Sequence, residues 1–568
     1  MNFSHYYHTI RYLKPHQIVA QARNRLRLKL ENPSRFGARP APDFPGCIWK
    51  PALAFLPPGA QRNRTTAILQ GKMTFINQEY AIGWMPDWGR ADLPKLWLYN
   101  LNYFEWLWAF DQPGDATDFE TAKSVVRDWI CRHTLSRGQQ GWEPYPVSLR
   151  LMNWCPFFYG AHHSQTLDDA AFNEHLWDSI RLQADWLAAH LEDHLLGNHL
   201  LENAAALTLT GACFDGPAAK RWMGVGLKLL QAQTREQILS DGMHFERSSM
   251  YHARVVHLFL MLRNTGNPQL RQAVDPVLPK MLKALAALCH PDEEIALLND
   301  SALGIYNEPG ELFAYAVRMG LVAPDAGNAP HGAWSLPEAG YYGYRGNDGT
   351  YIVCDAGPIG PDYIPGHAHA DTFSFELSLK GCRVIVDSGV HDYEKGEMRS
   401  YCRSTRAHNT VEIEGQDQSE MWDAFRVARR AYPHDATWAP QPDGFQLTGR
   451  HDGYMRLNGR PVHHRTFSYR EGGKIEVVDR VESERPVQCR SMLHLHPECI
   501  CTMIDKKTAS IQYPAGSFRI SYSGRGLLEC RDGIYCPEFN VQQKNQVLLF
   551  SWTSSGSSAV KYTIETQS

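Results

Sequence analysis

The sequence lacks the features that would assign it to a membrane or to nucleic acid. No apolar run approaches the ~20 residues of a membrane-spanning helix, and the longest candidate covers only residues 258–262. A formal net charge of −4 over 568 residues excludes a global attraction to polyanions. Hydrophobic residues make up 43% and charged residues 21%, which is typical of globular proteins. The length allows roughly two to four domains.

Signs of an oxidising compartment are also missing. The thirteen cysteines are odd in number and include no CxxC pair. Cys213, Cys289 and Cys354 stand in apolar surroundings, as buried thiols do. The first eight residues lack a basic segment followed by an apolar one, which argues against a secretory signal. We therefore expect reduced cysteines and a cytoplasmic protein, with the periplasm as the alternative if a signal has been removed.

Residues 1–62 are predicted to form a basic helix and an irregular connector. From Pro15 onward an apolar stripe recurs at helical spacing, with basic residues mostly on the other side: Ile18, Val19, Ala22, Leu26 and Leu30 against Arg23, Arg25, Arg27 and Lys29. Such a helix can lie on a membrane surface. We favour the alternative that it packs on its own domain with a solvated face. Residues 31–62 are rich in Pro, Arg and Asn.

The remaining chain divides into a helical half, residues 63–335, and a β half, residues 336–568. Apolar residues recur at helical spacing through the first half, and short Gly, Asn and Pro loops separate the helices, which indicates an α/α array. After Gly340, short alternating strands dominate and predict an antiparallel, sandwich-like region. The residues around 329–332 are expected to be the linker.

Four stretches of the helical half carry polar side chains among apolar neighbours. Tyr99 and Asn102 lie in an aromatic run, residues 96–108, that would divide between core and a sugar-binding groove. The other three contain Arg150, then Asn198, His199 and Glu202 at a helix start, then Arg247, Tyr251 and His252. Singly, each polar group is best explained as a satisfied core residue. Together they suit β-elimination from a uronate, which needs a neutralised carboxylate, a base and an acid.

The β half carries a histidine motif, Gly366-His367-Ala368-His369-Ala370-Asp371, followed by Asp387 and His408. His369, Asp387 and His408 form a plausible two-histidine, one-carboxylate set for a divalent ion such as zinc. Alternate strand residues face one side, so His367 could meet a substrate while His369 holds the metal. Histidines hydrogen-bonded to backbone at strand ends are nearly as good an explanation.

In order along the chain, the motifs Asn-His-x-x-Glu-Asn, Glu-Arg-Ser-Ser-x-Tyr-His, Gly-His-Ala-His-Ala-Asp, Val-Asp-Ser-Gly and Arg-Ala-His-Asn-Thr resemble the heparinase II/III family of polysaccharide lyases. The resemblance implies an N-terminal incomplete (α/α) toroid, a C-terminal antiparallel β-sandwich and a cleft between them. It implies that Asn198 or His199 neutralises the uronate, that Tyr251 is base, acid or both, and that His367 assists. Glu202, Arg247 and His252 would shape the site. His369, Asp387 and His408 would hold structural zinc.

We therefore expect a lyase acting on an acidic, uronic-acid-containing polysaccharide, similar to family members associated with surface-polysaccharide production. Nucleic acid and membrane spans are not expected, and nothing in the sequence indicates the oligomeric state. Two alternatives remain. One is a catalytically silent carbohydrate-binding or assembly protein on the same scaffold. The other is a zinc-dependent glycan hydrolase, since three protein ligands leave a position for water.

Overall fold

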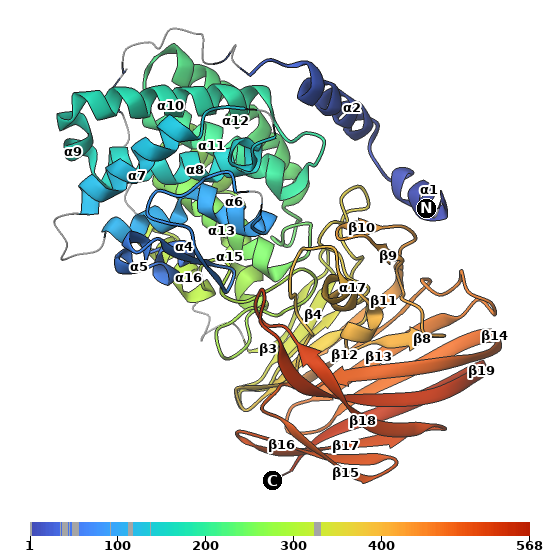
Figure 1. Ribbon diagram of the computed structural model, residues 1–568. Coiled ribbons are helices and arrows are strands. Elements are labelled where there is room, and N and C mark those ends of the chain that lie inside the picture. Colours follow the sequence, from blue (N-terminus) through green and yellow to red (C-terminus); the bar gives the residue numbers. More distant parts are fainter. Residues whose placement is uncertain are drawn as a thin grey trace.

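The computed structural model shows a helical half and a β half side by side (Figure 1). It describes residues 3–33, 36, 44, 46–47, 56–90, 92–111, 118–136, 138–322 and 331–567. Much of the expected connector at 31–62, and linker residues Ala329 and Pro330, lie outside the described residues. An N-terminal helical toroid followed by an antiparallel β-sandwich was the predicted fold class, and it is confirmed.

The helical half is built around three nearly buried helices, α8 (Pro144–Pro156), α11 (Gly197–Cys213) and α13 (Ser249–Asn264). A Cβ at Gly226 would lie 2.9 Å from the Ala204 carbonyl oxygen, so glycine allows α12 to pack closely on α11. The other elements of this half are α4 (Pro58–Arg62), α5 (Thr65–Leu69), β1 (Lys72–Phe75), β2 (Gln78–Ala81), α6 (Lys95–Tyr103), α7 (Asp118–Arg132), α9 (His163–Asp168), α10 (Ala170–Ala189), α12 (Gly216–Gln237), α14 (Pro268–Val274), α15 (Leu278–Ala287) and α16 (Pro309–Arg318).

Two helices, α1 (Phe3–Ile10) and α2 (Pro15–Leu30), precede the toroid and lie outside it (Figure 1). The expected basic helix is therefore present as α2, and it packs on its own protein. Its orientation is the reverse of an ordinary amphipathic helix. Polar residues such as Gln17 face the protein, whereas Ile18, Val19, Leu26 and Leu30 of the apolar stripe are exposed. None of the described helices is both long enough and apolar enough to span a bilayer.

The β half contains two main antiparallel sheets. The smaller has the order β3-β4-β5-β6-β7, and the larger the order β11-β12-β13-β14-β19-β17-β16-β15, with β18 on β19 and β8 on β14. Their apolar side chains share one core, where Phe375 meets Phe467 at 5.5 Å between ring centroids. The strands are β3 (Gly332–Leu336), β4 (Tyr341–Arg345), β5 (Tyr351–Asp355), β6 (Phe375–Leu379), β7 (Cys382–Ile385), β8 (Val411–Ile413), β11 (Pro433–Gln441), β12 (Gly444–His451), β13 (Val462–Arg470), β14 (Ile475–His494), β15 (Ile500–Asp505), β16 (Thr508–Tyr513), β17 (Gly516–Ser523), β18 (Leu527–Tyr535) and β19 (Gln543–Gln567). A short helix, α17 (Glu397–Cys402), and the pair β9 (Met421–Trp422) and β10 (Arg426–Val427) flank the sheets.

Buried polar contacts join the two halves. Arg247, two residues before α13, donates to the carbonyl oxygens of Ala339 at 2.9 Å and Glu338 at 3.1 Å. His290 Nε2 lies 2.8 Å from Glu376 Oε2 on β6. Because these groups are buried, separating the halves would leave charged and polar atoms without partners. The relative position of the halves is thereby determined, and with it the geometry of any site between them.

Candidate active site

A cleft of about 490 Å³ lies where the two halves meet. The toroid contributes Tyr99, Asn198, His199 and Tyr251 to its lining, and the β half contributes His367, together with Tyr393 and Phe425. All four residues expected to be catalytic, Asn198, His199, Tyr251 and His367, thus line one cleft. Their chemical roles remain predictions.

The start of α11 holds Asn198 and His199 at the cleft. Leu196 and Gly197 both have positive φ, 66° and 56°, and a Cβ at Gly197 would lie 2.4 Å from Glu246 Oε1. Glycine therefore permits a sharp turn against that carboxylate, which accepts the Asn198 backbone N–H at 2.9 Å. The Asn198 side chain lines the cleft at the positive end of the helix dipole, where an anion is favoured.

His199 is held in place by Glu192 and Tyr145. Its Nδ1 lies 3.0 Å from Glu192 Oε1, and its ring packs on Tyr145 with 4.4 Å between centroids. Burial disfavours the imidazolium form, but the nearby carboxylates, Glu192 foremost with Glu246 and Glu202, together outweigh burial and raise the pKa of His199. The ring is thus biased toward the charged form that would pair with a carboxylate, and the Glu192 contact leaves Nε2 for a ligand.

Tyr251 and His367 face each other across the junction, with 4.0 Å between ring centroids. Tyr251 lies in the first turn of α13, where the Ser248 side chain caps the Tyr251 N–H at 3.2 Å. The phenol oxygen is 3.0 Å from Tyr393 Oη. Burial, with a smaller contribution from Tyr393, raises the pKa of Tyr251 well above its usual value. The free protein therefore carries a protonated phenol beside an imidazole.

Asp300 connects this pair to the rest of the β half. It comes from the helical half, yet its Oδ2 lies 2.8 Å from His367 Nδ1 and its Oδ1 lies 2.9 Å from His369 Nε2. The Arg399 guanidinium donates to both oxygens, one bond being 2.8 Å. Burial would raise the pKa of Asp300, but Arg399 and the two histidines hold it well below its usual range. Asp300 was not among the predicted site residues, and a carboxylate two residues after the apolar run 295–298 was the available signal.

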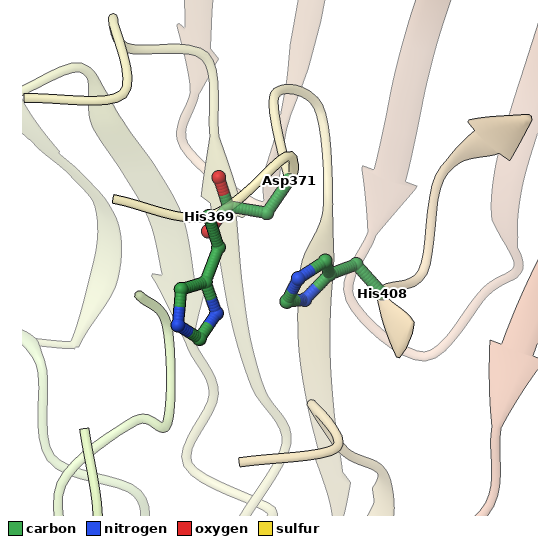
Figure 2. Close-up of side chains that lie close together, drawn as sticks. All are labelled: His369, Asp371 and His408. Atoms are coloured by element: carbon green, nitrogen blue, oxygen red, sulfur yellow. The ribbon is translucent and has the colours of Figure 1, made fainter. Parts of the chain in front are cut away.

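Three side chains, one of them the His369 that bonds to Asp300, converge on a candidate metal site. Figure 2 shows these side chains, His369, Asp371 and His408. His369, Asp371 and His408 are buried, and their potential ligand atoms lie within 4.8 Å of one another. His369 Nδ1, His408 Nε2 and both Asp371 oxygens have no hydrogen-bond partner in the structure. Unpaired buried polar atoms are costly, so a divalent cation accounts for this arrangement.

The expected ligand Asp387 is not one of these three converging side chains. Its Oδ2 accepts from His408 Nδ1 at 2.7 Å and its Oδ1 from the Gly389 N–H at 3.0 Å, so it lies behind His408. A carboxylate in that position orients the imidazole and raises its basicity. Asp371 supplies the facing carboxylate instead. Its place two residues after His369 was a usable signal, but Asp371 was not included in the predicted metal set.

Asn102 and Arg150, expected to bind substrate, are buried in the toroid core and do not line the cleft. The Asn102 amide donates to the Leu98 carbonyl at 2.9 Å and accepts from Trp129 Nε1 at 3.0 Å. Arg150 donates to Gln183 and to two backbone carbonyls, and its guanidinium lies 4.0 Å from the Trp129 ring centroid. Both expectations are wrong because the protein itself supplies the partners.

Glu202, Arg247 and His252 are likewise bonded within the protein rather than exposed in the cleft. Glu202 receives a two-point contact from Arg254, at 2.6 and 3.1 Å. Arg247 joins the two halves, as described above, and His252 Nε2 lies 2.9 Å from the Met281 carbonyl oxygen. They support the cleft wall without lining it. Tyr99 alone of the expected substrate-binding residues lines the cleft, where it donates to Glu143.

Comparison with known proteins decides the family. The model described as heparinase II/III N-terminus matches residues 82–312, and that described as heparinase II/III-like, C-terminal, matches residues 328–563. The chain belongs to the heparinase II/III family. Three curated relatives are named heparin-sulfate lyase. That of Pedobacter heparinus is 28% identical over 320 residues, 51% of this chain and 47% of the relative. That of Bacteroides thetaiotaomicron is 23% identical over 403 residues, 60% and 55% of the two chains. The chain therefore spans about half the length of the curated relatives it matches.

Solved structures show the same fold. A heparinase III crystal structure superposes with a TM-score of 0.73 at 17% identity, covering 94% of this chain and 88% of the other. The heparan sulfate lyase HepC of Pedobacter heparinus gives 0.64 at 22% identity, covering 94% and 87%. These similarities establish the architecture of this member of the heparinase II/III family.

Substitutions at the two aspartates distinguish their roles. Asp371→Asn should remove most bound metal, because the Asp371 carboxylate is a direct ligand in this assignment. Asp387→Asn should lower metal affinity by about 10–100-fold, because the Asp387 carboxylate only orients the ligand His408. Mass spectrometry of metal content, with titration of the metal-free protein, measures both effects. The exposed Asp532→Asn serves as control. Full metal content in Asp371→Asn would contradict the assignment.

Proposed function

We propose that this protein is a polysaccharide lyase that cleaves a uronic-acid-containing polymer by β-elimination. The observation that carries the proposal is the cleft itself. An amide and an imidazole at the start of α11 face the same space as a phenol and an imidazole, Tyr251 and His367, whose rings are 4.0 Å apart. The family assignment and the names of the curated relatives support the same reaction.

The first chemical requirement is to neutralise the uronate carboxylate, which makes the C5 proton more acidic. Asn198 can donate an amide N–H, and His199, with its pKa raised by Glu192, can donate from a positively charged ring. Both lie at the N-terminal end of α11, which favours negative charge. We assign them jointly to the carboxylate, with His199 supplying the charge.

The second requirement is proton transfer on both sides of the breaking bond. His367 accepts the C5 proton at Nε2, because Asp300 holds the other ring nitrogen. Tyr251, protonated in the free protein, donates to the leaving 4-oxygen. The C5–H and C4–O bonds break and a C4–C5 double bond forms without addition of water. Tyr251 returns to its protonated form by exchange with His367 or solvent.

A zinc ion is the cofactor we propose for His369, Asp371 and His408, because two imidazoles and a carboxylate suit a borderline divalent ion. When bound, it would clamp the loop that carries His367 to the segment that carries His408. None of its three proposed ligands lines the cleft. A structural ion therefore fits better than the hydrolytic zinc considered as an alternative.

The charged side chains that line the cleft also restrict which polymers can bind. It includes Glu143, Glu192, Glu246 and Glu394, whereas Lys95 is the only lysine or arginine among the described lining residues. That lysine is paired with Glu143 at 3.1 Å. Sulfate groups would meet carboxylates here, and close like charges are costly. We propose a uronate polymer with little or no sulfate at the cleavage site, bound through aromatic side chains such as Tyr99 and Tyr103.

The cytoplasmic location and a role in surface-polysaccharide metabolism also remain proposals.

Loss of the phenol hydroxyl should stop the reaction. Tyr251→Phe should lower turnover by about a hundredfold or more, because the leaving oxygen loses its acid. The measurement is ultraviolet absorbance of the unsaturated product on heparosan, hyaluronan, alginate and glucuronan. Tyr159→Phe removes a hydroxyl that bonds Asn173 within the toroid and should leave turnover unchanged. Near-normal turnover in Tyr251→Phe would refute its role, and a product without a double bond would refute elimination.

Sulfation of the polymer should lower the kcat/KM of its cleavage. The kcat/KM on unsulfated heparosan should exceed that on heparan sulfate by about tenfold or more, since one unfavourable charge contact of ~1.4 kcal/mol gives that ratio. Glu394→Gln, at an exposed position of the cleft lining, should reduce the ratio of kcat/KM on heparosan to kcat/KM on heparan sulfate. The exposed Glu484→Gln on β14, outside the cleft, is the matched control. Faster cleavage of heparan sulfate would contradict the proposed restriction while leaving the lyase assignment intact.

A further inference from the structure

The N-terminal arm, defined as residues 3–30 with α1 and α2, attaches to the protein through polar groups. Lys14, just before α2, pairs with Glu236. On α2, Gln17 donates to the Tyr363 carbonyl at 3.2 Å, and Arg27 donates to the Ala189 carbonyl at 2.5 Å. On α1, Thr9 Oγ1 donates to the Val427 carbonyl at 3.1 Å. The arm therefore touches the toroid and the β half at once, beside their junction (Figure 1).

Its outward face is apolar. Seven of the seventeen large apolar side chains exposed among the described residues belong to this arm: Phe3, Tyr7, Ile10, Ile18, Val19, Leu26 and Leu30. Phe3 is 83% exposed, Leu30 76% and Val19 66%. The four on α2 fall within a sector of about 120° on a helix of 3.6 residues per turn. Such a concentration marks an interaction surface rather than scattered surface residues.

Charge indicates the partner. Residues 3–30 contain six lysines and arginines and no acidic residue, although the whole chain has a net charge of −4. Two acidic groups that face the arm are paired with its own basic residues, Glu236 with Lys14 and Asp193 with Arg23. Arg11 and Arg25 are exposed beside the apolar side chains, and Arg27 bonds to a backbone carbonyl rather than to an acid. The arm thus combines an apolar face with a net positive charge.

We infer that the N-terminal arm docks this protein onto the surface of an anionic membrane. Helices that are apolar on one face and rich in Lys and Arg lie in the plane of the lipid headgroups. The arm also borders the cleft. Asp193, bonded to Arg23, is two residues from Leu195, and Trp422, which packs on Tyr6 at 4.8 Å, is three residues from Phe425. Leu195 and Phe425 are exposed and line the cleft. Docking would bring the cleft mouth to the lipid surface, whatever reaction it performs.

Vesicle flotation with the full chain tests the inference. The protein should float with vesicles of equal parts phosphatidylglycerol and phosphatidylcholine, and at least tenfold less with pure phosphatidylcholine. Val19→Asp/Leu26→Asp, which places acids on the outward face, should reduce the bound fraction at least tenfold. Leu527→Asp, at an exposed leucine of β18, is the control and should bind normally. Circular dichroism confirms that each variant folds.

Each other outcome overturns the inference. Equal binding to both vesicle types would show apolar insertion without charge selection. A second outcome is that the protein does not bind vesicles and forms a dimer, measured by light scattering, that Val19→Asp/Leu26→Asp dissociates. That result would assign the face to a second copy of the chain. Absence of binding by a monomer would leave the face without this function. Turnover on soluble polymer reports separately on the proposed lyase activity, so failure of one proposal does not imply failure of the other.

Discussion

The carboxylate of Asp300 is the contact on which the site depends. It originates in the toroid, yet it binds His367 and His369 of the β half and is held ionised by Arg399. A single buried anion thereby orients the cleft imidazole and one proposed metal ligand. The same loop ties to α13, because Ser248 Oγ donates to the Asp300 carbonyl at 2.6 Å while capping Tyr251. The segment that contains Asp300 therefore positions the Tyr251 phenol and the His367 imidazole relative to each other.

This arrangement explains why the two halves must meet in one orientation. Asn198, His199 and Tyr251 are on helices of the toroid, whereas His367 and the metal site are on loops of the β half. Neither half holds a carboxylate-neutralising group and both proton-transfer groups by itself. Buried contacts across the junction, such as Arg247 to the Ala339 carbonyl, determine the register between them. The proposed elimination thus depends on interdomain packing as much as on any motif.

Much of this could be predicted from the sequence, because periodicity and short motifs are local. The change from helical to alternating patterns separates the two halves, and the family motifs point to the residues that line the cleft. Prediction failed where the answer depends on partners far along the chain. The Arg150 guanidinium donates to the backbone carbonyl of Asn102, forty-eight residues away. Glu202 is paired with Arg254, fifty-two residues away. Polar residues in apolar stretches look alike whether their partner is a ligand or the protein.

The metal set and the N-terminal helix show two further limits. Asp371 and Asp387 both follow His369 at spacings open to a ligand, and only the hydrogen bond to His408 shows that Asp387 lies behind the ring. On α2, helical periodicity correctly predicts the apolar stripe, but a stripe does not reveal which side packs. Here Lys14, Gln17 and Arg27 provide the inner contacts and the stripe faces outward.

The most direct test of this account is turnover and metal content measured on the same preparation of Asp300→Asn. Asparagine keeps the shape but removes the charge that pairs with Arg399 and orders both histidines. We expect the unsaturated product to form at least about tenfold more slowly and metal affinity to fall by about 10–100-fold, in a protein that retains its fold. Normal turnover with normal metal content would contradict the central role of Asp300.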